Sequence, residues 1–209
     1  MKNSHKKYFV VAIDGPAGAG KGTIAKAVAK HFNFSHLDTG LLYRAVASKA
    51  LQGNDPIKIA RKFDESFLAS STLRTPRVEK MASQIATMPA IRAALFKFQK
   101  SFAHQPGGNV LDGRDIGTVI CPEADIKLFV TASIEARALR RYNELRKLGS
   151  DTKYKTVLRT LKERDMLDIT RDSAPLIKAK DAYLLDTTEL NISASVKAAT
   201  RLVENAFNP

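Results

Sequence analysis

The sequence has no tryptophan, a single cysteine and no block of five or six consecutive lysines or arginines. One cysteine, Cys121, excludes a disulfide scaffold and indicates a reducing compartment. No apolar run reaches the roughly 18–20 residues that a membrane span needs. The apolar stretch at 8–13 is too short for the core of a signal peptide. We therefore expect a soluble cytoplasmic protein with no membrane partner.

The residue patterns typical of metal sites and of serine or cysteine nucleophiles are also missing from the sequence. The four histidines show no metal-ligand spacing, so no structural metal is predicted. There is no G-x-S-x-G turn for a serine nucleophile, and Cys121 has no histidine near it in the sequence to activate a thiol. These absences argue against metal-dependent hydrolysis and against covalent catalysis.

Acidic residues are fewer than basic residues. Lys and Arg number 34 against 21 Asp and Glu, which gives a net charge of +13. Such an excess attracts anions of every kind, including nucleic acid, anionic lipid and nucleoside phosphates. The basic residues are spread along the chain, and aromatics are only 7% of it, which argues against a nucleic-acid-binding face. Charge alone therefore does not identify the partner.

Strand-like and helix-like segments alternate along the chain. Short apolar runs predict strands at 9–13, 109–112, 126–130 and 181–186, with one more just before Asp38. Periodic segments predict helices at 23–32, 41–51, 91–102, 133–148, 154–168 and 193–207. This alternation predicts an α/β fold, a parallel sheet covered by helices on both faces. We expect one domain over 1–209, with an insert of helical pieces and loops at about 55–89.

A glycine-rich segment joins the first predicted strand to the first predicted helix. Glycines let backbone amides turn inward around phosphate oxygens, and the helix start adds its own amides. The lysine can reach the β- and γ-phosphates. The alternative is a structural turn. The usual pattern has Ser or Thr directly after the lysine, but here the hydroxyl comes one residue later. The predicted phosphate loop comprises Gly15, Pro16, Ala17, Gly18, Ala19, Gly20, Lys21, Gly22 and Thr23.

Two further polar clusters follow predicted strands. The first contains Asp38, Thr39 and Arg44, at the edge where ligands bind α/β sheets. A helix cap and a surface arginine are the alternative there. In the second cluster, Asp112 can orient Mg²⁺ through water and Arg114 suits a phosphate. Its neighbour Asp115 can accept ribose hydroxyls, and the alternative is an ordinary polar turn.

Charged residues on the two long helices form the last clusters. Arg164, Asp168 and Arg171 recur at helical spacing, so we expect them on one face. They bind phosphate, or they form exposed ion pairs worth well under about 1 kcal/mol each. The loop between these helices is predicted to form a lid at about 142–157. At least one of three arginines on the preceding helix is expected to act in catalysis, and the sequence does not say which: Arg137, Arg140 or Arg141.

The chain as a whole resembles the bacterial cytidylate kinase, or (d)CMP kinase, family. The stretches that carry the resemblance are AIDGPAGAGKGT at 12–23, LDTGLLYR at 37–44, ASQIATMPAIR at 82–92, LDGRDIGTVICPEA at 111–124 and KERDMLDITRDSAPL at 162–176. With the final LLDTTEL, the similarity covers essentially the whole sequence. Adenylate kinases share the phosphate loop but carry a different motif in place of DGRDIGT.

The resemblance implies a three-layer P-loop kinase that transfers the γ-phosphate of ATP to CMP or dCMP. ATP would lie on residues 15–23, with Mg²⁺ on its phosphates and with Thr23 and Asp112 as candidates that act through water. Lys21, Arg114, Arg164 and Arg171 would offset charge during transfer. It further implies a monomer with no nucleic-acid partner. The implied acceptor site comprises Thr39, Arg44, Ser83, Arg92, Arg114, Asp115, Arg164, Asp168 and Arg171.

The chain departs from the family pattern at two places. The segment between Arg44 and Ser83 is shorter than in many members, where it carries a small β-rich subdomain. Leu167 replaces an arginine of some relatives. Two alternatives stay open. One is another small P-loop kinase, acting on UMP, AMP or a small metabolite. The other is a nucleic-acid-binding NTPase module, whose binding would fall steeply with salt.

Overall fold

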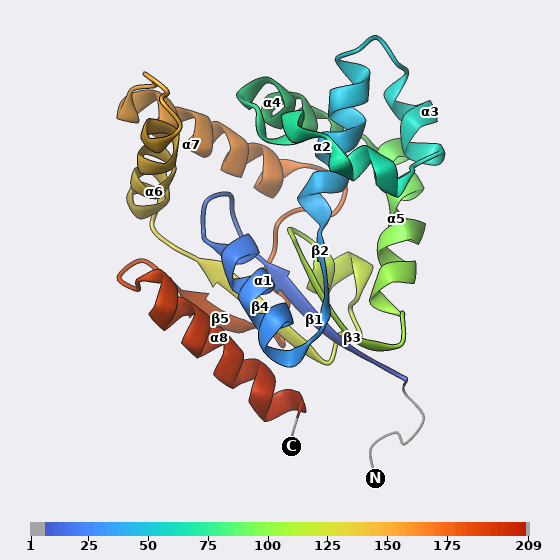
Figure 1. Ribbon diagram of the computed structural model, residues 1–209, viewed down its shortest axis with the longest axis vertical. Helices are drawn as coiled ribbons and strands as arrows, with labels where there is room; N and C mark the ends of the chain where they lie inside the picture. Colours follow the sequence, from blue (N-terminus) through green and yellow to red (C-terminus); the bar gives the residue numbers. More distant parts are fainter. Residues whose placement is uncertain (1–6, 208–209) are drawn as a thin grey trace.

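A five-stranded parallel sheet forms the centre of the computed structural model, which describes residues 7–207. The strands lie in the order β2-β3-β1-β4-β5, and every pairing is parallel (Figure 1). All strand ends that carry polar motifs therefore meet at one edge of the sheet. The strands are β1 (Tyr8–Asp14), β2 (Ser35–Asp38), β3 (Gly107–Gly113), β4 (Ile126–Thr131) and β5 (Tyr183–Asp186).

Helices cover both faces of this sheet, which makes three layers (Figure 1). On one face lie α1 (Lys21–Phe32) and α8 (Ile192–Phe207). The other face is covered by α2 (Thr39–Ala50), α3 (Pro56–Arg61), α4 (Pro76–Ile85), α5 (Pro89–Ala103) and a π-turn, η3 (Ile116–Ile120). A separate pair, α6 (Ile134–Lys147) and α7 (Tyr154–Thr170), stands above the sheet edge. The predicted α/β fold is confirmed.

Strand β1 explains why both faces need cover. Val10 and Ala12 point into the core under α2 and α5, whereas Val11 and Ile13 point into the core under α1 and α8. All four side chains are buried. A strand that is apolar on both sides needs helices on both sides, since either bare face would expose its apolar residues to water.

The predicted elements are confirmed, and the differences lie at their ends. The last strand was expected from residue 181 but begins at Tyr183, because a turn closes with the bond from Ala182 N–H to the Ala179 carbonyl, 3.0 Å. The expectation that Arg171 lies on a helix face is wrong. Helix α7 ends at Thr170, and Arg171 has an extended backbone, with φ −65° and ψ 139°.

The stretch 55–89 consists of helical pieces joined by short loops, as expected, with no strand among them. It contains α3, α4 and two 3₁₀ turns, η1 (Glu65–Ala69) and η2 (Ser71–Arg74). The Asp55 carboxylate caps α3 by accepting the Ile57 N–H at 2.8 Å, and proline occupies the first helical position. Val78, Ala82 and Ile85 anchor α4 in the core.

The α6–α7 pair has a small core of its own. Ala138, Val157 and Leu161 pack together with Ala17 of the glycine-rich loop. The two helices thus meet the main body at that loop, and the connection between them, 148–153, lies at the far end. None of the described helices has the length and hydropathy to cross a membrane.

Candidate active site

The glycine-rich loop lies between β1 and α1, at the carboxyl edge of the sheet. Gly18 and Gly20 have φ of 74° and 91°, a backbone conformation that residues with a Cβ rarely adopt. Lys21 folds back over the loop, and its Nζ donates to the Pro16 carbonyl at 2.7 Å. Loop amides, a helix start and an ammonium group therefore surround one point, which suits the phosphates of a nucleotide.

Lys21 is buried, with 6% of its surface exposed. Burial, reinforced by the nearby Arg114 guanidinium, holds the pKa of this ammonium well below its ordinary value. A bound phosphate would reverse this effect by supplying the missing negative charge. The attraction between Lys21 and an anionic ligand is therefore stronger at this position than it would be in water.

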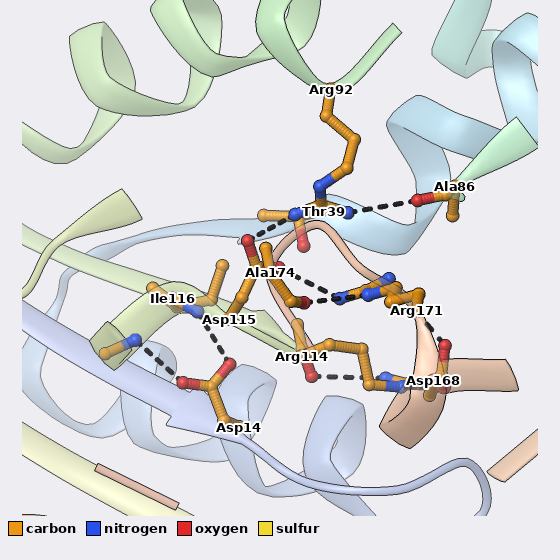
Figure 2. Close-up of polar contacts among 12 residues, drawn as sticks. Asp14, Thr39, Ala86, Arg92, Arg114, Asp115, Ile116, Asp168, Arg171 and Ala174 are labelled. Carbon is orange, nitrogen blue, oxygen red and sulfur yellow. Dashed lines mark hydrogen bonds and ion pairs between the residues drawn. The ribbon is translucent and has the colours of Figure 1, made fainter. Parts of the chain in front are cut away.

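Beside the loop, three arginines and two aspartates from distant elements form a network of ion pairs. Figure 2 shows Arg92 of α5 reaching Asp115, and Arg171 lying beside the same carboxylate. The Arg92 guanidinium also donates to the Ala86 carbonyl at 3.3 Å. Arg171 Nη2 lies 3.6 Å from Asp115 Oδ1, and its Nε donates to the Ala174 carbonyl at 2.7 Å. These contacts join α5, the turn after β3 and the turn after α7.

A second ion pair joins β3 to α7. Arg114 Nε donates to Asp168 Oδ2 at 2.7 Å, and Arg171 Nη1 lies 3.8 Å from Asp168 Oδ1 (Figure 2). Burial opposes the charge of Asp168, but Arg114 and Arg164 more than offset it and lower the pKa of the carboxyl. The carboxylate is thus held ionised between arginines. Arg171 joins the site although it lies beyond the helix, because the chain turns back there with the Leu176 N–H on the Asp168 carbonyl, 2.7 Å.

Three guanidinium groups at this edge have a buried nitrogen with no hydrogen-bond partner in the described part of the chain: Arg44 Nη1, Arg164 Nε and Arg171 Nη2. Burial and the neighbouring Arg114 lower the pKa of Arg164 to about 10. Buried donors are nearly always paired in proteins. Unpaired arginine donors beside a phosphate loop indicate a place for an anion that bridges them, because guanidinium groups bind phosphate oxygens in a bidentate way.

Asp112 is the penultimate residue of β3 and lies beside the start of α1. Its Oδ1 pairs with His36 Nε2 at 2.7 Å, and its Oδ2 lies 3.8 Å from where a Cβ of Gly22 would stand. Thr39 lies next to it and donates from Oγ1 to the Asp112 carbonyl at 2.8 Å. A carboxylate oxygen facing the helix start fits a role beside Mg²⁺ on nucleotide phosphates. Thr23 is exposed on the first turn of α1.

Comparison with known proteins agrees with this geometry. The family model described as cytidylate kinase matches residues 11–205. The chain is 57% identical to a cytidylate kinase from Cereibacter sphaeroides strain KD131 over 94% of this chain and 95% of that protein. It is 48% identical to one from Sinorhizobium medicae over 96% and 98%.

The chain belongs to the cytidylate kinase family.

Solved structures support the fold. A protein from Eubacterium ventriosum aligns with a TM-score of 0.59 at 15% identity, over 96% of this chain and 99% of its own. TT1252 from Thermus thermophilus aligns with a TM-score of 0.51 at 18% identity, over 98% and 100%. At such identities the similarity concerns the fold alone.

In this member of the cytidylate kinase family, the three candidate lid arginines are all engaged. Arg137 is buried, donates to the Ala17 and Ala132 carbonyls at 3.0 Å each and pairs with Asp165 at 2.7 Å. Arg140 bonds Thr187, and Arg141 pairs with Glu79 and Glu144 at 2.8 Å each. Only Arg137 touches the phosphate loop itself.

Ser83 and Arg92 come from the insert side of the site. Ser83 is partly buried on α4, and its Oγ donates to the Glu79 carbonyl at 3.1 Å. Arg44 is held by Asp38, with Nη2 3.9 Å from Oδ1. The insert also contributes Arg74, whose Nη2 donates to Asp38 Oδ2 at 3.1 Å.

Sequence reasoning missed several members of this network. Asp14, His36, Arg74 and Glu79 contact the predicted residues or the backbone beside them. Asp14 could have been found, since it immediately precedes the glycine-rich segment at the end of a buried strand. The other three belong to no local pattern, and only the packing of the insert and of β2 brings them to the site.

Proposed function

We propose that this protein transfers the γ-phosphate of ATP to CMP or dCMP and produces ADP with CDP or dCDP. The observation that carries the proposal is the set of buried arginine nitrogens, on Arg44, Arg164 and Arg171, that have no hydrogen-bond partner among the described residues and lie beside a loop built for phosphate. Family membership supports a cytidine nucleotide as the acceptor.

In this proposal ATP occupies the loop 15–23, and Lys21 binds its terminal phosphates. The lowered pKa of the buried Lys21 supports a role that is completed by an anionic ligand. Mg²⁺ bound with ATP would neutralise part of the phosphate charge. Thr23 and Asp112 are the residues that would hold it, through water. Within residues 7–207, no three His, Cys, Asp or Glu side chains form a metal site of their own.

The acceptor nucleotide is proposed to lie between the insert and α7. Arg114, Arg164 and Arg171 would bind its phosphate, and Asp115 and Asp168 its ribose. Ser83 and Arg92 would read the cytosine ring. The remaining contacts to the acceptor would come from Thr39 and Arg44.

The chemistry needs little beyond placement and charge. The acceptor is already a phosphate oxyanion, so no general base is required. In-line transfer brings two phosphates end to end, and Lys21, Arg114, Arg164 and Arg171 offset their charge. Water must be kept out, so the insert at 55–89 and the lid at 142–157 are proposed to close over both substrates.

The setting proposed for this reaction is the cytoplasm, in pyrimidine nucleotide metabolism. The sequence has one cysteine, Cys121, whose side chain is buried, and this low cysteine content supports a reducing compartment. We propose a monomer without a nucleic-acid partner, as the resemblance to cytidylate kinases implies.

A coupled assay of ADP release with MgATP tests the function, with CMP, dCMP, UMP and AMP each at the same concentration. The proposal predicts strong turnover with CMP and dCMP and little with AMP. Comparable turnover with UMP would leave the kinase reaction but remove the cytidine preference. No turnover with any nucleotide, by protein that still binds ATP, would overturn the proposal in favour of a small-metabolite kinase or a nucleic-acid module.

A further inference from the structure

Asp14 ends the central strand β1 and has no role in the reaction proposed above. Its carboxylate accepts two consecutive backbone N–H groups from the turn after β3. Oδ1 accepts from Ile116 at 2.8 Å and Oδ2 from Gly117 at 2.7 Å (Figure 2). The side chain is buried, and the described residues place no cation within ion-pair distance of it.

The turn held by Asp14 carries two proposed acceptor residues directly before Ile116. Asp115 contacts Arg92 and Arg171, and Arg114 contacts Asp168. These side chains leave the backbone one and two residues before the first anchored N–H. Anchoring two successive amides fixes the direction in which Arg114 and Asp115 point.

The opposite side of the turn has no room to move. A Cβ added at Gly113 would lie 2.6 Å from Thr39 Oγ1 and 2.8 Å from Ile116 Cδ1. Packing therefore holds the turn from the α2 side, and the Asp14 carboxylate holds it from the β1 side. Among these contacts, only the Asp14 carboxylate accepts two backbone N–H groups of the turn, one with each oxygen.

Stability alone does not account for a carboxylate here. Burial is the largest influence on Asp14 and raises its pKa to about 6, although both amides favour the charged form. A charged group in this place therefore lowers the stability of the fold relative to a neutral one. What the charge provides is two strong acceptors for Ile116 and Gly117.

We propose that Asp14 is a positioning residue for the acceptor nucleotide, acting through the turn 114–117. The inference rests on the proposed function. Asp14 touches neither substrate in this arrangement; it sets where Arg114 and Asp115 meet the phosphate and ribose of CMP. Loss of the carboxylate should therefore affect the acceptor more than ATP.

Asp14→Asn provides the sharpest test. Asparagine keeps the size but offers one oxygen and one NH₂, so one of the two amides loses its acceptor and faces a donor. The expected result is a KM for CMP raised about 10- to 100-fold with a lower kcat, as for loss of a charged hydrogen bond. The dissociation constant of MgATP, measured by calorimetry without CMP, should stay within about two-fold of wild type because the phosphate loop is unchanged.

Asp125→Asn is the matched control. Asp125 Oδ2 also accepts a backbone N–H of β1, from Val10 at 2.8 Å, but near the start of the strand, away from the site. The Asp125→Asn protein should have the same KM for CMP and the same kcat as wild type.

Gly117→Ala tests the same contact should Asp14→Asn fail to fold. The added Cβ would lie 3.1 Å from Lys127 Cδ and 3.4 Å from Asp14 Oδ2, so it displaces the turn and leaves the carboxylate in place. The same preferential rise in the KM for CMP is expected, with a smaller size.

Suppose that wild type and Asp125→Asn turn over CMP. A normal KM for CMP in Asp14→Asn, or an equal loss of CMP and ATP binding in that variant, would then overturn the inference. If wild type and Asp125→Asn also fail to use CMP, the proposed function falls and the inference falls with it.

Discussion

At the level of single residues, the site is marked by buried cationic side chains that lack a full set of anionic or hydrogen-bonding partners. Lys21 is buried with a backbone carbonyl as its hydrogen-bond acceptor, and Arg164 and Arg171 each have a buried nitrogen with no hydrogen-bond partner among the described residues. Each arrangement costs stability in the free protein. Each also prepares an interaction that phosphate can complete, since little rearrangement is needed on binding.

Replacing Lys21 separates these two effects. Lys21→Ala should lower kcat by about 10²- to 10³-fold or more, as for the loss of one preorganised charge in an active site. The fold should persist, because a buried ammonium with a depressed pKa is a cost to it. Turnover and far-UV circular dichroism measure the two quantities. A near-normal rate in this variant would contradict the proposed mechanism.

The Asp14 carboxyl makes stability depend on pH. Its pKa is about 6 in the folded chain and 3.8 in a model peptide, so the folded state binds the proton more tightly. The resulting stabilisation is present below about pH 4 and is lost as the pH rises through 6, with a size of about 3 kcal/mol.

Denaturant titrations of wild type and Asp14→Asn between pH 4.5 and 7.5 measure this dependence. The difference in free energy of unfolding should shift in favour of Asp14→Asn as the pH rises, because the variant has no proton to lose. A difference that does not change with pH would contradict the raised pKa.

At the level of elements, the α6–α7 pair connects the phosphate loop to the insert. Arg137 ties the base of the pair to Ala17 and to Asp165. Arg141 ties its side to Glu79 of α4. A buried contact and a partly exposed one thus join the same helix to two parts of the site, and their energies should differ accordingly.

This difference can be measured with two matched variants. Arg137→Gln leaves Asp165 without its buried partner and should lower the free energy of unfolding by about 3–5 kcal/mol. Arg141→Gln should change it by about 1 kcal/mol or less, since that pair is partly exposed to water. Chemical denaturation of both proteins gives the comparison. Equal losses would show that the α6–α7 pair is not held mainly at its base.

For the whole molecule, the net charge of +13 matters chiefly where arginines converge. Arg44 lies on α2, Arg92 on α5, Arg114 directly after β3, and Arg164 and Arg171 on α7 and directly after it. An anionic ligand bound among these arginines would contact several of these segments at once. The phosphate of the acceptor should therefore stabilise the entire fold rather than one loop.

Thermal unfolding with CMP tests this, with cytidine as the control ligand. At about 100 times its dissociation constant, CMP should add about 2.7 kcal/mol and raise the melting temperature by roughly 5–10 °C. Cytidine at the same concentration should have a much smaller effect, because it brings no phosphate to the arginines. Equal shifts would show that the base, not the phosphate, provides most of the binding energy.

The sequence by itself determined the elements and the chemistry. Strand and helix periods, and the nine-residue phosphate loop, depend on neighbours along the chain, so they could be predicted with only small errors at the ends. Five stretches of sequence, including the one around Arg114, carried the resemblance to the family. Helical spacing placed Arg171 on the same helix face as Arg164 and Asp168, and this was wrong because Arg171 lies just past the end of α7.

Only the tertiary structure decided which charges face each other. Asp14 and Ile116 are separated by 102 residues, and Glu79 and Arg141 by 62. The tertiary structure also determined the partners of the three candidate lid arginines, which the sequence places on one helix face. Arg137 contacts the phosphate loop, Arg140 the turn after β5, and Arg141 the insert. The physical reason is that backbone preferences act over a few residues, whereas the partner of a buried charge is set by how separate elements pack.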